Sequence, residues 1–143
     1  RGGGGGGALE SIFKEEEAKK ERQNRRDYWL HEGIVVKVMS KDLKEAGYYK
    51  AKGVVQRVHD RYVGQICING SGDVLKVDQA QLETVLPQPG GAVLIVNGAY
   101  RGERATLSGV DVDKFKAKVK VAGGQFRGRE VLLDYEDVCK LDK

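Results

Sequence analysis

The chain has 143 residues, of which 40% are hydrophobic and 32% are charged, and its formal net charge is +4. This length accommodates one ordinary domain or two very small ones, and it excludes a large enzyme. The chain begins with Arg1 and has no apolar run near the roughly eighteen residues of a membrane span, so the sequence predicts neither a signal peptide nor a transmembrane segment. We expect a soluble fragment of a longer protein.

The N-terminal part predicts one helix. Residues 1–7 contain six consecutive glycines, which favour a flexible lead-in. Residues 8–27 form a charged helical segment with Glu–Lys pairs at i,i+4 spacing. Its apolar face consists only of Leu9, Ile12 and Phe13, so we expect it to dock weakly or to project.

After Asp27 the apolar pattern changes to a period of two. Five short runs rich in β-branched residues follow, at residues 33–39, 52–58, 63–68, 73–77 and 82–86. The turn NGSG at 69–72 is a strong hairpin signal, because Asn and Gly accept positive φ. These features predict a small β-barrel over residues 28–86.

The segment PQPGG, residues 87–91, is a predicted linker, after which the pattern begins again. The later strands are predicted at residues 92–96, 104–110, 114–121 and 129–135. The endings VDQAQLETV (77–85) and LDYEDVCKL (133–141) are alike, and both fit an Asp before a single helical turn and a last strand. The sequence therefore predicts an internal duplication, with a second barrel over residues 92–143.

Charge is spread evenly along the chain. Basic and acidic side chains number seven and six over residues 1–27, eight and seven over residues 28–86, and ten and eight over residues 87–143. No segment is a polybasic tail, so any surface that binds anions has to be formed by folding.

Two basic segments are candidates for such a surface. In KFKAKVKV (114–121), alternation places Phe115 and the small apolar residues on one face and four lysines on the other, with successive lysines about 6.6 Å apart. This face fits a phosphate-tracking stripe, and equally an edge that discourages aggregation. In residues 41–52, lysines flank Tyr48 and Tyr49, which suits single-stranded nucleic acid or a solvated loop.

The sequence contains no pattern typical of a catalytic or metal site. His31 and His59 are isolated, and no nucleophile motif or Walker loop is present. Cys67 and Cys139 have no second Cys or His at zinc-site spacing, so we expect buried reduced thiols, no metal and no other cofactor. Glu136 and Asp137 fit a solvated helical turn better than an acid/base pair. We therefore expect a binding module and not an enzyme.

Residues 97–107, NGAYRGERATL, resemble a KOW motif, which opens an SH3-like barrel in ribosomal proteins and in elongation factors of the NusG and Spt type. Gly98 and Gly102 match its turn glycines, which allow a tight connection between strands. We expect Tyr100 and Arg101, between them, to be exposed. The core of this barrel is expected to contain Leu94, Val96, Ala105 and Leu107.

The wider sequence resembles the C-terminal region of the Kin-seventeen family of nuclear DNA/RNA-binding proteins. The resemblance is carried by ALESIFKEEEAKK (8–20), DYWL (27–30), LETVLP (82–87), NGAYRG (97–102) and YEDVCKL (135–141). It implies a mainly β fold, with a short helix followed by two tandem SH3-like barrels that share an interface. It also implies a basic groove between the barrels, in which Lys52 and Lys140 match the family's groove lysines.

From the resemblance and the residues together we expect nonenzymatic, mostly electrostatic binding of RNA, with DNA as the second ligand. The nucleic-acid-binding residues expected are Lys52, Lys140, Arg101, Arg104, Tyr100, Lys116 and Lys118. The family's roles imply DNA replication, the DNA-damage response and repair, mRNA processing and spliceosome association. They also imply spliceosomal or replication proteins as partners and a nuclear location, with the cytoplasm as a second compartment. We expect a monomer without membrane contact.

A protein-interaction module is the alternative. SH3-like and Tudor-like barrels also bind peptides, and Trp29, Tyr48, Tyr49 and Tyr62 would supply an aromatic surface or cage. A third interpretation, in keeping with the near-neutral charge balance, is a scaffold that only docks onto the spliceosome.

Overall fold

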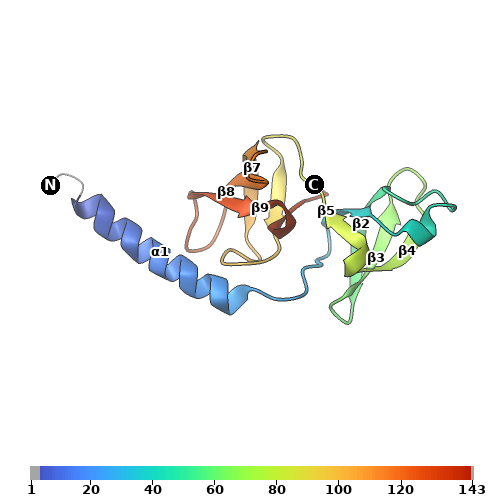
Figure 1. The fold of residues 1–143 in the computed structure, drawn as a ribbon, viewed down its shortest axis with the longest axis horizontal. Coiled ribbons are helices and arrows are strands. Elements are labelled where there is room, and N and C mark those ends of the chain that lie inside the picture. Colours follow the sequence, from blue (N-terminus) through green and yellow to red (C-terminus); the bar gives the residue numbers. More distant parts are fainter. Residues whose placement is uncertain (1–3, 143) are drawn as a thin grey trace.

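The computed structural model describes residues 4–142, which form one helix and two small antiparallel barrels of five strands each (Figure 1). The first barrel contains β1 (Val35–Val38), β2 (Lys52–His59), β3 (Val63–Ile68), β4 (Val74–Asp78) and β5 (Leu82–Thr84). The second contains β6 (Ala92–Ile95), β7 (Arg104–Asp111), β8 (Lys116–Val121), β9 (Glu130–Asp134) and β10 (Val138–Lys140). The expected mainly β fold with two tandem barrels is confirmed.

The two barrels have the same connectivity. The strand order is β4-β3-β2-β1-β5 in the first and β9-β8-β7-β6-β10 in the second, so each strand has a counterpart five strands later. Both barrels have a register shift in their second strand, and in both a single 3-10 turn, Gln79–Gln81 or Tyr135–Asp137, precedes the last strand. This agreement supports the internal duplication inferred from the two similar endings.

Strand β6 is buried on both faces. Its side chains alternate between cores: Val93 and Ile95 belong to the core of the second barrel, whereas Leu94, and Val96 directly after the strand, belong to that of the first. The expectation that Leu94 and Val96 fill the second barrel is therefore wrong. An unbroken apolar run is typical of a strand whose two faces are both buried. Here one face of β6 packs in the second barrel and the other packs against the first barrel.

Strand β10 is shared in the same way. Val138 lies in the core of the second barrel, and the fully buried Cys139 lies in that of the first. Backbone pairing reinforces the junction, because Leu141 forms an isolated antiparallel bridge with Ile34. The two barrels therefore share an apolar interface instead of being joined only by a linker.

Helix α1 (Gly4–Asn24) lies against the second barrel (Figure 1). It begins within the glycine run that we assigned to the lead-in, and glycine in a helix costs about 1 kcal/mol relative to alanine. Phe13 packs edge-on against Phe126, with ring centroids 6.4 Å apart, while Leu9 and Ile12 stay exposed. Within residues 4–142, no helix combines the length and apolar character needed to cross a membrane.

Candidate nucleic-acid interface

The KOW-like turn connects β6 to β7, and its glycines are required by the backbone. Gly98 and Gly102 have φ values of +85° and +90°, in the left-handed region that favours glycine. A Cβ atom at Gly98 would also lie only 2.7 Å from Glu21 Oε1 of α1. The predicted backbone role of both glycines is confirmed, and Gly98 additionally allows the helix to approach.

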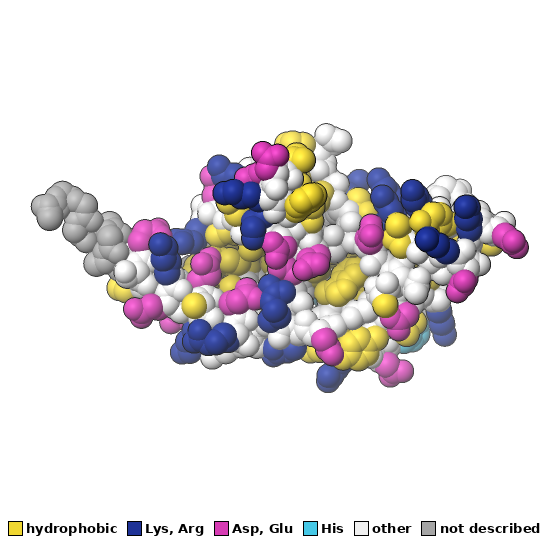
Figure 2. All heavy atoms as spheres, in the orientation of Figure 1, with side chains coloured by type: hydrophobic (Ala, Val, Ile, Leu, Met, Phe, Trp, Pro, Cys, Tyr) yellow, Lys and Arg dark blue, Asp and Glu magenta, His cyan; other side chains and the backbone are white. Residues whose placement is uncertain are grey.

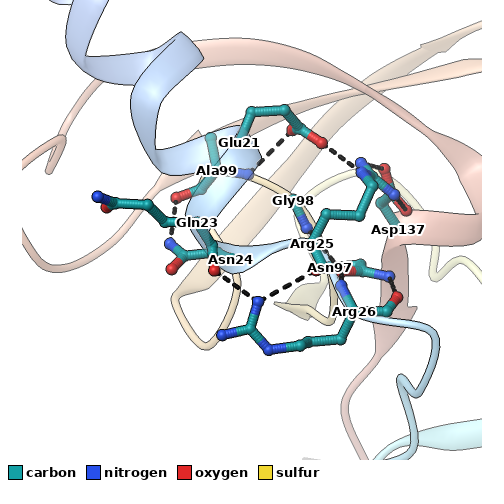
Figure 3. Close-up of polar contacts among 9 residues, drawn as sticks. All are labelled: Glu21, Gln23, Asn24, Arg25, Arg26, Asn97, Gly98, Ala99 and Asp137. Carbon is teal, nitrogen blue, oxygen red and sulfur yellow. Dashed lines mark hydrogen bonds and ion pairs between the residues drawn. The ribbon is translucent and has the colours of Figure 1, made fainter.

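The end of α1 is bonded to this turn (Figure 3). The Asn97 amide forms a two-way pair with the backbone of Arg26, accepting from its N–H at 2.8 Å and donating to its carbonyl at 2.7 Å. The Ala99 N–H donates to Glu21 at 3.0 Å, and the Ala99 carbonyl accepts from Asn24 at 3.2 Å. The turn is therefore covered by α1 and its polar groups are satisfied there.

Arg25 connects the same helix end to the last 3-10 turn (Figure 3). Its guanidinium donates twice to the buried Asp137 carboxylate, at 3.2 and 2.8 Å, and also pairs with Glu21. The hydrogen bond from Arg25 lowers the pKa of Glu21, and the two carboxylates raise that of Arg25, with the Asp137 hydrogen bond as the largest cause. Glu21, Arg25 and Asp137 thus form one charge-assisted network.

Tyr100 is not exposed. Only 2% of it is accessible, its ring packs edge-on against Phe126 at 5.1 Å between centroids, and its hydroxyl donates to Glu17 of α1. Burial is the main cause of its raised pKa, and the Glu17 hydrogen bond adds to it. The expectation that Tyr100 is exposed at the turn is wrong, because α1 covers this side of the turn.

Arg101, its neighbour, points to the junction of the barrels. Its guanidinium carbon lies 4.9 Å from the ring centroid of Tyr28, and that of Arg61 lies 5.1 Å from the same centroid. We call these three residues the Tyr28 stack. Arg101 belongs to the second barrel, whereas Arg61 is in the β2–β3 turn of the first, so the stack brings cations from both barrels to one aromatic ring.

Sequence reasoning missed Tyr28 and Arg61. The turn HDRY, residues 59–62, was visible as a connection, but its consecutive positive φ values at Asp60 and Arg61, +49° and +72°, were not. Tyr62 supports the stack from the side, with its ring 6.1 Å from that of Tyr28 and its hydroxyl bonded to Asp27. A basic residue in a tight turn is a local signal, whereas its aromatic partner lies more than thirty positions earlier and depends on tertiary structure.

Lys52 and Lys140 lie at strand ends of different barrels. Both side chains are exposed, and neither forms a salt bridge within the part of the chain that the structure describes. The β1 residue Lys37 is the register partner of Lys52 on one side and of Glu83 on the other. Lys140 donates its backbone N–H to Val85, which follows β5. Lys140 therefore lies beside the first barrel, whereas Lys52 lies two strands away from β5, on the other side of β1.

The lysine face of β8 is partly neutralised by β9. Lys116 Nζ lies 2.9 Å from Asp134 Oδ1, and Lys118 Nζ lies 3.6 Å from Glu130 Oε1. The hydrogen bond to Asp134 raises the pKa of Lys116. This pairing favours the interpretation that the lysines of β8 discourage aggregation over the interpretation that they bind successive phosphates. Arg104, at the start of β7, is exposed.

The cleft between the barrels is acidic. Its volume is about 640 Å³, and it is lined by Arg25, Trp29, Leu82, Glu83, Thr84, Asn97, Lys114, Phe115, Asp134, Tyr135, Glu136 and Asp137. These include four carboxylates against two cations, and neither Lys52 nor Lys140 is among them. This cleft is therefore not the basic groove that we expected.

Phe115 is 68% exposed instead of facing the core, because it precedes β8 and has a φ of +55°.

Comparisons with known proteins match both barrels. Residues 87–142 match the KIN17 C-terminal SH3 domain, and residues 25–78 match the KN17 SH3-like domain. A KIN17-like protein of Arabidopsis thaliana is 63% identical over 85% of this chain and 30% of its own length. The DNA/RNA-binding proteins KIN17 of Mus musculus and Homo sapiens are 47% and 44% identical, each over 85% of this chain and 31% of their own length. The chain spans about a third of the curated relatives it matches.

Proposed function

Because this chain belongs to the KIN17 family, whose tandem SH3-like domains it contains, we propose that it is a nonenzymatic nucleic-acid-binding region. RNA is the preferred ligand and DNA the second. The names of the mouse and human relatives, which are DNA/RNA-binding proteins, support this class of ligand.

The observation that carries the proposal is the Tyr28 stack. Its two guanidinium groups come from different barrels, lie about 5 Å from one ring, and have no salt-bridge partner among residues 4–142. Arginines held against an aromatic ring keep N–H groups for phosphate and offer a planar surface for bases. Lys52 and Lys140 are further exposed cations without a salt-bridge partner among residues 4–142, although Lys52 lies at the opposite end of β2 from Arg61. Arg104 adds an exposed cation on β7.

The paired lysines contribute less. A phosphate that contacts Lys116 or Lys118 first has to displace the carboxylate of Asp134 or Glu130. Likewise, the acidic cleft repels a polyanion. Binding therefore follows the outer surface of the junction, with weak sequence preference and a dissociation constant on the order of micromolar, as is typical of nonspecific phosphate contacts.

In the full-length protein we assign this region to nuclear DNA replication and repair and to RNA processing, with spliceosomal or replication proteins as further partners. The family resemblance supports these roles. We propose that the region itself is monomeric.

The test is a salt titration of binding to a fluorescent oligouridylate, measured by anisotropy. Two double variants, Lys52→Ala/Lys140→Ala and Arg61→Ala/Arg101→Ala, are compared with Lys116→Ala/Lys118→Ala as the matched control. Each lost phosphate contact makes the negative slope of log K against log salt shallower by about 0.7, so each test pair is expected to make it shallower by about 1.4. Equal losses in the control, or binding insensitive to salt, would contradict the proposal.

A further inference from the structure

The acidic cleft that the nucleic-acid interface leaves unused has aromatic walls. Trp29 lines it from the segment before the first barrel, and Phe115 and Tyr135 line it from the second barrel. In the space-filling view, hydrophobic side chains lie in a hollow between the barrels with acidic side chains at its edge (Figure 2). The cleft therefore combines aromatic rings and carboxylates, and both kinds of group attract cations.

Phe115 is held in an unusual position. Its φ of +55° lies in the left-handed region that disfavours residues with a Cβ, and 68% of the residue is exposed to solvent. The Phe115 carbonyl accepts a hydrogen bond from the Tyr135 N–H at 3.3 Å, and the two rings meet edge-on with centroids 6.2 Å apart. The tight turn between β7 and β8, in which the Phe115 N–H donates to the Val112 carbonyl, sets this backbone conformation and leaves the Phe115 ring uncovered on the wall of the cleft.

The charges of the cleft are arranged by depth. At the floor, Asp137 is buried and neutralised by Arg25. Asp134 is exposed and paired with Lys116. At the rim, Glu83 and Glu136 are exposed and form no salt bridge within the described part of the chain. Among the described residues that line the cleft, Lys114 is the one cation besides Arg25, so the cleft keeps a negative balance.

We infer that this cleft binds a basic peptide segment of a partner protein, with a lysine or arginine side chain inserted between the aromatic walls. A cation over an aromatic face is attracted by the ring quadrupole, and the rim carboxylates add charge complementarity. The volume of about 640 Å³ is within the range of sites that enclose a small ligand, and it accommodates one long side chain. Nucleic acid is the disfavoured occupant, because its phosphates would meet Glu83 and Glu136.

This site differs from the aromatic cage expected from the sequence. Of the four residues named there, only Trp29 lines the cleft. Tyr48 packs on the core of the first barrel and donates to Asp73, and Tyr62 is engaged by Tyr28 and Asp27. The second barrel, which the sequence did not implicate, contributes the remaining aromatic walls.

Trp29 is the single tryptophan of the chain, so its fluorescence reports directly on the cleft. We would titrate the protein with a short peptide that has a central Lys-Arg-Lys run flanked by Gly and Ser, and with the same peptide carrying Gln in place of the basic residues. The basic peptide is expected to change Trp29 emission saturably, and the neutral peptide is expected not to. The absence of a response to the basic peptide would overturn the inference.

Two variants localise the effect. Phe115→Ala removes an exposed wall and is expected to weaken peptide binding about fivefold, in line with one lost cation–π contact. Its matched control is Val112→Ala, which truncates a 67% exposed apolar residue of the same turn, outside the cleft, and is expected to leave binding unchanged. Equal effects of the two variants would overturn the inference.

Glu136→Gln is expected to weaken peptide binding and to flatten its salt dependence, whereas Glu45→Gln, an exposed acid outside the cleft, is expected to change neither. An oligouridylate is expected not to compete with the peptide for the Trp29 signal. Competition that disappears in Phe115→Ala would mean that the cleft takes nucleic acid, and would also overturn the inference.

Discussion

The two barrels have the same strand order, but only the second is covered by the helix. In the second barrel, α1 is bonded to the connection between its first two strands, so Ala99 and Tyr100 are buried. In the first barrel, the corresponding connection, residues 39–51, is mostly exposed. The difference shows that the KOW-like turn, the most recognisable motif of the sequence, serves mainly to dock the helix, and that Arg101 is half-buried at the turn instead of exposed as expected.

The shared interface limits how far the barrels can be treated as separate repeats. Leu94→Ala is expected to lower the free energy of unfolding by about 3 kcal/mol, because a buried leucine is replaced by a cavity. Although Leu94 belongs to a strand of the second barrel, it packs in the core of the first. Urea unfolding followed by both far-UV circular dichroism and Trp29 fluorescence should therefore shift equally with the two probes. Leu132→Ala, at a half-exposed leucine of β9, is the control, and transitions that separate between the two probes in Leu94→Ala would show that the barrels unfold independently.

The helix cover depends on the network at its end. Arg25→Ala is expected to destabilise the protein by about 2 kcal/mol, because it leaves the buried Asp137 carboxylate without its charged partner. The neighbouring Arg26→Ala removes an exposed arginine whose side chain bonds only to nearby carbonyls, and should cost much less. Thermal unfolding measures both. Similar losses of stability in the two variants would mean that the contact between Arg25 and Asp137 does not specifically hold the helix on the second barrel.

A smaller effect is expected where the turn meets the helix. Tyr100→Phe keeps the buried ring but loses the hydrogen bond to Glu17, at a cost of about 1 kcal/mol. Hydrogen exchange of the α1 amides should accelerate more than that of the β2 amides. Tyr49→Phe, on the uncovered connection of the first barrel, is the control and should leave exchange in α1 unchanged.

The smallest expected effect is on pH dependence. The pKa of Glu21 is lowered in the folded protein, chiefly by its hydrogen bond from Arg25, so ionised Glu21 stabilises the folded state above its ordinary pKa of 4.5. This contribution is lost as the pH falls below 4.5 through the folded-state pKa. Denaturant unfolding at successive pH values below 6 should show a decline that is shallower in Glu21→Gln. Identical profiles would mean that Glu21 does not couple the helix to the turn.

Much of the fold could be predicted from the sequence, because strand alternation, turn residues and the repeated ending are local signals. Which core each face of β6 contacts could not be predicted. Leu94 and Val96 follow the expected alternation, but they pack against the first barrel, which is formed by a separate part of the chain. For the same reason Tyr100 was assigned to the surface: nothing near it in the sequence indicates that Glu17 and Phe126 enclose it.

The candidate site was less predictable than the fold. The exposure of Lys52 and Lys140 agrees with their expected role, but the pairing of Lys116 with Asp134 depends on the register between β8 and β9. The Tyr28 stack joins three segments that are distant in the chain, and no spacing rule brings them together.

The most direct test of the central claim is a chemical-shift map of the amide and guanidinium signals during titration with an oligouridylate. We expect the largest changes at Arg61, Arg101, Lys52 and Lys140, with little change at Lys118 or around Phe115 and Glu136. Shifts concentrated on the lysine face of β8 or in the acidic cleft, with the Tyr28 stack unaffected, would contradict the assignment of nucleic-acid binding to the junction of the two barrels.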